Sequence, residues 1–471
     1  MMPTPRNKRV LLVCAAVCAA WIGLGTRTAG YTRPSSAPET LPVLLPRARQ
    51  IEVREGWLAK RHQMILPLLR RHGLGMWIVV NEEFHADPLT EFVAPPRPYC
   101  GNRDIFVFID AGEAGLKKLA ITGYSEENVD RFFETPAPGA GGKALREAFD
   151  KFQPNTIGLG IGGRRGVTRS LTHDSYKYLA DLMGPEAEKR FVSAAALIEE
   201  FLDTRIPEEF EPYEALVQVT EILARRALSN EVIIPGRTTV GDVRRWLFSQ
   251  SGALDLQPWF QPDLRIQRLD TAGDAAPRGF LPVAKEDTII ERGDVIQLDF
   301  GLTYMGLNSD WQKMLYVLRE GETDAPAGLN QALANTNALQ DALARISRPD
   351  KPVNEVAEET MAAMKAKGIT AMIYSHPLGN QGHALGASIN ARPANPQAKP
   401  DQGVAAKPNP NPPPPKRLRL GSYLAMELNT ATAVAEWGGK QVTMMGEDPV
   451  YLTADGWKFF RPRQEALYLV R

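Results

Sequence analysis

The sequence has little cysteine and little histidine, and it carries no excess charge of either sign. Only 3 of its 471 residues are cysteine, which excludes a disulfide-rich scaffold and a four-cysteine zinc site. Lys and Arg number 55 and Asp and Glu number 55, which argues against binding nucleic acid or acidic membranes by bulk charge. Only 6 histidines are present, so a metal site in this chain must rely mainly on carboxylates.

Several common catalytic motifs are also missing. The sequence has no Gly-x-Ser-x-Gly elbow, no phosphate-binding Walker loop and no His-Glu-x-x-His zinc motif. The glycine-rich run at 158–163 follows a plausible strand, but no apolar helix opens after it. We therefore interpret this run as a turn and not as a dinucleotide site.

The first 50 residues are typical of a segment that directs export. Residues 1–30 combine a basic start with an apolar run from Val10 to Leu24. Fifteen residues rise only about 22 Å as a helix, which is short of a hydrocarbon core of about 30 Å. We therefore expect a signal peptide and a periplasmic or secreted protein, with a membrane anchor as the alternative. The prolines of 31–50 indicate a linker.

The rest of the chain is long enough for two domains, at roughly 150 residues per domain. Strands and helices alternate over 51–204, which predicts an α/β domain. Long amphipathic helices and strand-rich segments over 205–471 predict a second domain, so the overall class is α+β. Residues 392–416 contain nine prolines and are expected to form a solvent-exposed insertion.

The last third of the chain places acids in pairs on the arms of two predicted β-hairpins. The midpoint of Asp299 and Asp310 falls at the bend of the first hairpin. The midpoint of Glu427 and Glu447 falls next to a Gly-Gly turn in the second. Because paired strands bring opposite positions together, the two carboxylates of each pair can lie close to each other.

Four carboxylates at one place would repel one another, and their pKa values would rise. Two divalent cations would cancel the four negative charges. His383 lies between the two hairpins among small residues and suits a fifth ligand, with His376 as the alternative. Such a donor set suits Mn²⁺, and also Zn²⁺, Co²⁺ or Fe²⁺. Ions of this kind activate water and polarise carbonyl groups, which predicts a hydrolase.

These segments resemble the pita-bread-fold metallopeptidases, the family that contains aminopeptidase P, prolidase, methionine aminopeptidase and the metal-free creatinase. The matching motifs are Leu298-Asp299-Phe300-Gly301, Ser309-Asp310, Gly382-His383-Ala384-Leu385-Gly386, Ala425-Met426-Glu427 and Gly446-Glu447-Asp448. The resemblance implies a C-terminal pita-bread catalytic domain preceded by a creatinase-type α/β N-terminal domain. It also implies a homodimer.

The resemblance further implies that Asp299, Asp310, His383, Glu427 and Glu447 hold two divalent metal ions, for which the donor set favours Mn²⁺. Glu427 would also accept the proton of the attacking water. The implied activity is hydrolysis of peptide bonds, above all Xaa-Pro bonds, by an aminopeptidase or a dipeptidase.

The sequence departs from the family pattern around the substrate. Relatives carry a histidine before the first aspartate, whereas 230–298 contains none. A second histidine usually lies seven residues after the ligand histidine, and Asn390 stands at that position if His383 is the ligand. Leu428 replaces a proline, and Lys313 replaces an arginine.

These departures leave several roles open. His376 could supply a missing catalytic imidazole, and Arg461 and Arg463 could bind a substrate carboxylate. One alternative function is a catalytically impaired peptidase scaffold that binds a partner. Another is a hydrolase of a non-peptide amide.

Overall fold

The computed structural model describes six stretches of the chain, namely residues 40–96, 101–122, 127–137, 139–270, 280–392 and 415–471. Leu41–Arg471 form one compact unit. The predicted signal peptide, most of the predicted linker and nearly all of the proline-rich insertion lie outside the described residues. Among the described helices, none combines the length and the apolar character that a membrane crossing requires.

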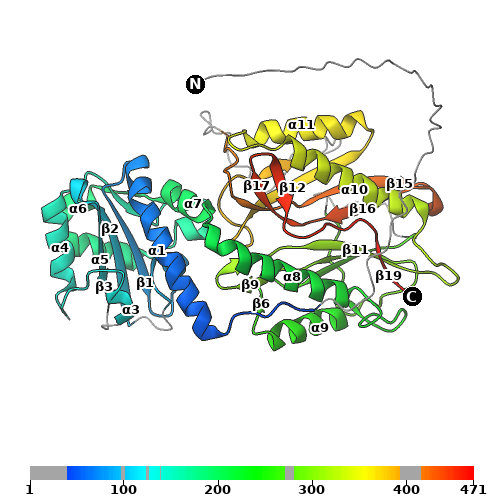
Figure 1. Ribbon diagram of the computed structural model, residues 1–471, viewed down its shortest axis with the longest axis horizontal. Helices are drawn as coiled ribbons and strands as arrows, with labels where there is room; N and C mark the ends of the chain where they lie inside the picture. The colour runs from blue at the N-terminus through cyan, green and yellow to red at the C-terminus, as the bar shows by residue number, and fades with distance from the viewer. Residues whose placement is uncertain (1–39, 97–100, 123–126, 138, 271–279, 393–414) are drawn as a thin grey trace, which may run out of the picture. The chain divides into compact units, whose positions relative to one another are not determined.

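The first half of the chain forms a five-stranded sheet of order β3-β2-β1-β4-β5 (Figure 1). In this sheet β1 pairs antiparallel with β2 and parallel with β4. The strands are β1 (Met76–Glu82), β2 (Arg103–Asp110), β3 (Leu116–Ile121), β4 (Ile157–Leu159) and β5 (Phe191–Ser193). The helices are α1 (Arg47–Arg71), α2 (Thr90–Val93), α3 (Glu127–Asp130), α4 (Gly141–Phe152), α5 (His173–Met183), α6 (Pro185–Glu188) and α7 (Ala195–Asp203).

Both faces of this sheet are buried, which explains the nearly continuous apolar run of its central strand. Trp77 and Val79 pack with residues of α1 and α7, whereas Ile78 and Val80 pack with residues of α4 and α5. Helix α1 begins at Arg47, so part of the predicted linker belongs to this helix.

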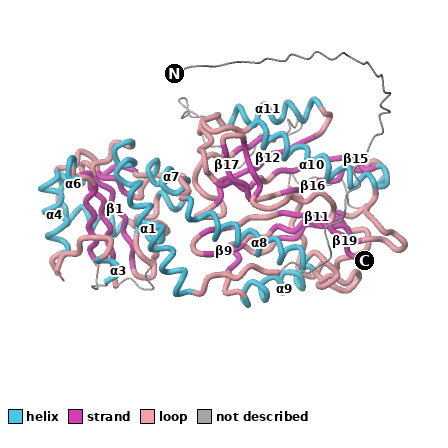
Figure 2. Tube along the Cα trace, viewed as in Figure 1, coloured by secondary structure: helices cyan, strands magenta, loops and turns pink. Residues whose placement is uncertain are grey.

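In the second half of the chain, strands lie between two pairs of helices (Figures 1 and 2). One pair packs on β8 and β9 and the other on β12 and β15. The helices are α8 (Phe210–Ala227), α9 (Val240–Ala253), α10 (Ala327–Ile346) and α11 (Val353–Ala366). The strands are β6 (Gln257–Pro258), β7 (Asp263–Gln267), β8 (Val295–Asp299), β9 (Leu302–Tyr304), β10 (Leu307–Asn308), β11 (Gln312–Val317), β12 (Thr370–Leu378), β13 (Ile389–Ala391), β14 (Tyr423–Ala425), β15 (Leu428–Val434), β16 (Lys440–Gly446), β17 (Pro449–Thr453), β18 (Gly456–Phe459) and β19 (Tyr468–Val470).

These strands form three sheets whose registers position the acids. The largest has the order β16-β15-β12-β14-β17-β18 with β13 beside β12, the second has the order β19-β11-β8-β7, and the third has the order β10-β9-β6. The β15–β16 and β14–β17 pairings share one register, so Glu427 lies opposite Glu447 where they meet. In the β8–β11 pairing, Asp299 lies opposite Gln312 and not opposite Asp310, because the β9–β10 pairing continues the same register to a turn at Met305 and Gly306.

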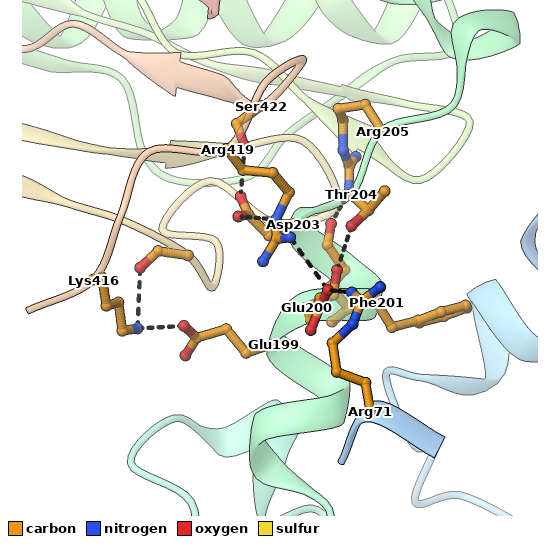
Figure 3. Close-up of polar contacts among 12 residues, drawn as sticks. Arg71, Glu199, Glu200, Phe201, Asp203, Thr204, Arg205, Lys416, Arg419 and Ser422 are labelled. Atoms are coloured by element: carbon orange, nitrogen blue, oxygen red, sulfur yellow. Dashed lines mark hydrogen bonds and ion pairs between the residues drawn. The ribbon is translucent and has the colours of Figure 1, made fainter. Parts of the chain in front are cut away.

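Charged side chains join α7 to the segment that leads into β14 (Figure 3). The guanidinium of Arg419 lies 3.2 Å from Asp203 Oδ2 and 3.2 Å from Glu200 Oε1. Lys416 Nζ lies 2.6 Å from Glu199 Oε1. These contacts attach the last helix of the first half of the chain to the largest sheet of the second half.

Candidate metal centre

Four acids lie at the ends of neighbouring strands. Asp299 ends β8, and Asp310 lies between β10 and β11. Glu427 separates β14 from β15, and Glu447 separates β16 from β17. Asp310, Glu427 and Glu447 are buried, and Asp299 is half-buried. The hairpins of the sequence prediction therefore supply all four acids to one region.

His376 lies among these acids. It is a residue of β12, where it pairs with Ala425 of β14, and only 5% of its surface is exposed. Its Nε2 atom lies 3.6 Å from Asp310 Oδ2, from Glu427 Oε2 and from Glu447 Oε1. Nδ1 lies 3.2 Å from the Pro377 carbonyl oxygen, to which it can donate a hydrogen bond. In that tautomer the Nε2 lone pair faces the carboxylates.

Several atoms of this group have no hydrogen-bond partner among the described residues. They are Asp310 Oδ1, His376 Nε2 and both carboxylate oxygens of Glu447. Buried polar atoms without partners are unfavourable, and each requires a physical explanation. One ligand atom from each of these three residues lies within 4.8 Å of the others. Their chemistry and spacing fit a divalent metal ion.

Burial shifts the pKa values of the same groups. It raises the pKa of Glu427 from 4.5 to about 7. Burial, followed by repulsion from neighbouring acids, raises the pKa values of Asp310 and Glu447 well above their usual range. Burial lowers the pKa of His376 to about 3, so its imidazole is neutral at physiological pH. A bound cation would favour the charged carboxylates and the neutral imidazole together.

The structure places His376, and not His383, among the carboxylates. The sequence favours His383 because small residues flank it, but His383 lies in the loop that follows β12, and its ring centroid is 4.5 Å from that of His376. With His376 as the ligand, His383 lies seven residues further on, where the resembled family has its second histidine. Asn390, by contrast, is an exposed residue of β13.

Arg461 and Arg463 each form hydrogen bonds with an acidic residue of the same chain. Arg461 Nε donates a hydrogen bond of 2.8 Å to Glu221. Arg463 Nη1 donates hydrogen bonds to Asp341 and to the carbonyl oxygen of Asn337. This arrangement favours a role in packing over the predicted role in binding a substrate carboxylate.

Sequence reasoning missed one polar side chain of β11 beside the acids, Gln312, and noted its neighbour Lys313 only as the replacement for an arginine. Gln312 Nε2 donates to Asp299 Oδ2 at 3.0 Å and to Glu427 Oε1 at 2.9 Å. Lys313 forms a buried ion pair with Asp448. The available signal was the presence of two adjacent polar residues at the start of an otherwise apolar strand.

A pocket of about 430 Å³ opens beside His383. Arg165 and Trp259 contribute to its wall, as does Asn380, whose side-chain amide is buried without a partner among the described residues. Arg165 follows the glycine-rich run after β4, which leads into a three-residue 3-10 helix, as expected of a turn. The pocket combines a cation, an aromatic ring and an amide next to the candidate metal centre.

Comparison with known proteins agrees with this geometry. Residues 257–454 match the model of metallopeptidase family M24. The X-Pro aminopeptidase from Thermotoga maritima MSB8 has a similar structure, with a TM-score of 0.62 and 15% sequence identity over 87% of this chain and 100% of that chain. The second half of the chain therefore has the pita-bread fold, and residues 257–454 within it resemble the M24 metallopeptidases. The sequence-based prediction of this family and fold class is therefore confirmed.

Two further structures show the same fold. The Xaa-Pro dipeptidase from Bacillus anthracis has a TM-score of 0.55 and 15% identity, covering 90% of this chain and 99% of that chain. The prolidase from Pyrococcus furiosus has a TM-score of 0.54 and 14% identity, covering 85% of this chain and 99% of that chain. No curated protein sequence matches the chain. Because both structural identities are low, these likenesses establish the pita-bread fold and leave the specific reaction to be argued from the site.

Proposed function

We propose that the chain is a metal-dependent peptidase that cleaves Xaa-Pro bonds. The observation that carries the proposal is His376 Nε2, which lies 3.6 Å from oxygens of three buried acids. The M24 match and the Xaa-Pro peptidases among the similar structures support the reaction class. Mn²⁺ is the proposed ion, because carboxylates outnumber imidazoles in the ligand set.

Each residue near the candidate metal centre has its own proposed role. Asp310, His376 and Glu447 would hold a divalent ion, which when bound polarises a carbonyl group and makes water more acidic. The carboxylate of Glu427, whose Oε2 atom lies 3.6 Å from His376 Nε2, can take up a proton from water and transfer it to the departing amine. His383 lies between the metal ligands and the pocket, where it can donate a hydrogen bond to a bound peptide.

The pocket beside His383 suits a short peptide. The guanidinium of Arg165 can pair with a terminal carboxylate, and the indole of Trp259 offers an apolar face for a proline ring. We further propose that the protein is exported, because of its basic and apolar N-terminal segment, and that it acts as a homodimer, as expected from the resemblance.

Hydrolysis of Gly-Pro, of Ala-Pro and of a tripeptide with proline at its second position tests this proposal. We expect the purified full-length protein loaded with Mn²⁺ to cleave at least one of them, and a matched peptide without proline more slowly. Glu427→Gln should lower kcat by at least about 100-fold. The matched control Glu358→Gln changes an exposed residue of α11 and should leave kcat unchanged.

Failure of every peptide with Mn²⁺, Zn²⁺ and Co²⁺ would contradict the proposal. The absence of a histidine from 230–298 favours one second candidate, a peptidase scaffold that binds peptides without cleaving them. That candidate predicts peptide binding by calorimetry with no turnover in the same samples.

A further inference from the structure

Gln312 places a side-chain amide within the group of acids. It lies directly opposite Asp299 in the β8–β11 pairing and is 1% exposed. Its backbone also exchanges two hydrogen bonds of 3.2 Å with that of Glu447. Gln312 is therefore held by the β8–β11 pairing on one side and by the backbone of Glu447 on the other. These contacts fix the position of its side chain.

The amide nitrogen of Gln312 is shared by two carboxylates. Nε2 lies 3.0 Å from Asp299 Oδ2 and 2.9 Å from Glu427 Oε1, so each carboxylate accepts one N–H. Gln297 Nε2 donates to Gln312 Oε1 at 2.8 Å, which holds the amide in this orientation. The reverse orientation would bring the amide oxygen against two carboxylates, which is electrostatically unfavourable.

The two carboxylate oxygens of Glu427 face different neighbours. Its Oε1 atom accepts the hydrogen bond from Gln312, whereas its Oε2 atom lies 3.6 Å from His376 Nε2. Among the four acids and His376, the buried atoms that have no partner in the described part of the chain belong to Asp310, His376 and Glu447. The Gln312 amide therefore already donates hydrogen bonds between Asp299 and Glu427, whereas the atoms around His376 still require a cation.

We propose that the chain holds one divalent ion, at Asp310, His376 and Glu447, and that the Gln312 amide takes the place of a second ion between Asp299 and Glu427. An amide NH₂ group carries partial positive charge and cannot ligate a cation, so an ion at the same two oxygens would have to displace it. The inference rests on the proposed metal-dependent function. It replaces the two-ion prediction of the sequence with a one-ion centre.

The number of ions bound per chain tests this inference without reference to activity. The full-length protein is stripped with chelator and titrated with Mn²⁺ by calorimetry, and its metal content is measured after desalting. Electron paramagnetic resonance distinguishes an isolated Mn²⁺ from a spin-coupled pair. We expect one tightly bound ion and an isolated-ion spectrum for the wild type.

Two variants of Gln312 and one control complete the experiment. Gln312→Thr removes the amide, and the isosteric Gln312→Glu replaces it with a further carboxylate, so each should bind a second ion at least about tenfold more tightly than the wild type does. Gln267→Thr is the control, since both ends of the Gln267 side-chain amide form hydrogen bonds with the backbone of Thr443 and not with any of the four acids. Melting curves of the metal-free variants show whether each is folded.

The outcomes separate this inference from the proposed function. Two tightly bound ions in the wild type would overturn the one-ion inference and leave a metal-dependent hydrolase in place. One ion in the wild type and in both Gln312 variants would overturn the role of Gln312. Binding of no Mn²⁺ would overturn the inference and the proposed function together.

Discussion

The imidazole rings of His376 and His383 lie 4.5 Å apart between centroids, with an angle of 76° between their planes. His376 is buried and faces the carboxylates, whereas His383 lines the pocket. Two histidines that are seven residues apart therefore face different partners. This separation supports the proposed metal binding by His376 and the proposed peptide contact by His383.

The two histidines should respond differently to removal. His376→Ala deletes a ligand and should weaken Mn²⁺ binding by at least about 100-fold. His383→Ala should leave Mn²⁺ binding within about tenfold of the wild type and lower kcat/KM for Gly-Pro by about 100-fold. Calorimetry measures the first effect and steady-state kinetics the second. Loss of metal in His383→Ala with retention in His376→Ala would reverse the assignment.

Metal binding should become stronger as the pH rises toward neutrality. Burial raises the pKa of Glu427 from 4.5 to about 7, so the metal-free folded chain retains a proton that an unfolded chain loses. This contribution to stability is present below pH 4.5 and is lost as the pH rises through 7. A bound ion replaces the proton, and its affinity should rise about 100-fold between pH 5 and pH 7.

The measurement is the difference in melting temperature between metal-loaded and metal-free protein at each pH. Taking this difference cancels the titration of groups far from the site, such as His62, whose pKa burial lowers to about 4. We expect the difference to grow from pH 5 to pH 7, and to grow less in Glu427→Gln. An equal difference at both pH values would argue that no proton is displaced.

The sequence predicts well that the acids lie close together, because two residues at equal distances from a hairpin turn lie opposite each other. Glu427 and Glu447 are equally distant from their turn, and the observed register pairs the residues on either side of them. For Asp299 the same argument was wrong by one residue in the position of the turn, which lies at Met305 and Gly306, so that Gln312 and not Asp310 lies opposite Asp299. Short strands of two or three residues carry too little hydrophobic pattern to be recognised in a sequence.

The ligand histidine was harder to identify, for a different physical reason. His376 precedes Pro377, and a proline weakens the evidence for a strand interior. In the structure both residues belong to β12, where His376 pairs with Ala425. The direction of its side chain is set by pairing with strands about 50 residues away, which local sequence does not reveal. The sequence favours His383 because small residues flank it and because its segment matches the histidine motif of the resembled family.

Lys313 should be important for the stability of the pita-bread domain. Its Nζ atom forms a buried ion pair with Asp448 and lies 3.1 Å from the Glu447 carbonyl oxygen, to which it donates. Lys313→Met leaves Asp448 with Gln340 as its remaining side-chain donor, at 2.9 Å. We expect a loss of about 3–5 kcal/mol in the free energy of unfolding, measured with urea at neutral pH.

Two companion variants separate the ion pair from general packing. Lys313→Arg restores the cation, and it should recover most of the lost stability. The double variant Lys313→Met with Asp448→Leu removes both charges and should be more stable than Lys313→Met alone. If Lys313→Met has the stability of the wild type, the pair contributes nothing that surrounding groups cannot replace.

The pair formed by Arg61 and Glu209 joins the first half of the chain to the second. Arg61 belongs to α1 and Glu209 to the turn before α8, and their side chains are 2% and 1% exposed. Arg61 also donates to the Phe201 carbonyl oxygen at 3.3 Å. Removal of Arg61 leaves the buried Glu209 with only the longer contact to Arg205, at 3.6 Å, so Arg61→Met should lower the free energy of unfolding by about 3 kcal/mol.

The exposed pair of Arg47 and Asp255 provides the matched control for Arg61. Their side chains are 77% and 64% exposed, and Arg47→Met should change stability by less than about 1 kcal/mol, because water and salt screen such pairs. Urea unfolding of both variants, with the double variant Arg61→Met and Glu209→Met, gives the comparison. Equal effects of Arg61→Met and Arg47→Met would contradict the prediction. A double variant that is more stable than Arg61→Met would identify the carboxylate of Glu209, which then has only the longer contact to Arg205, as the cause of the loss.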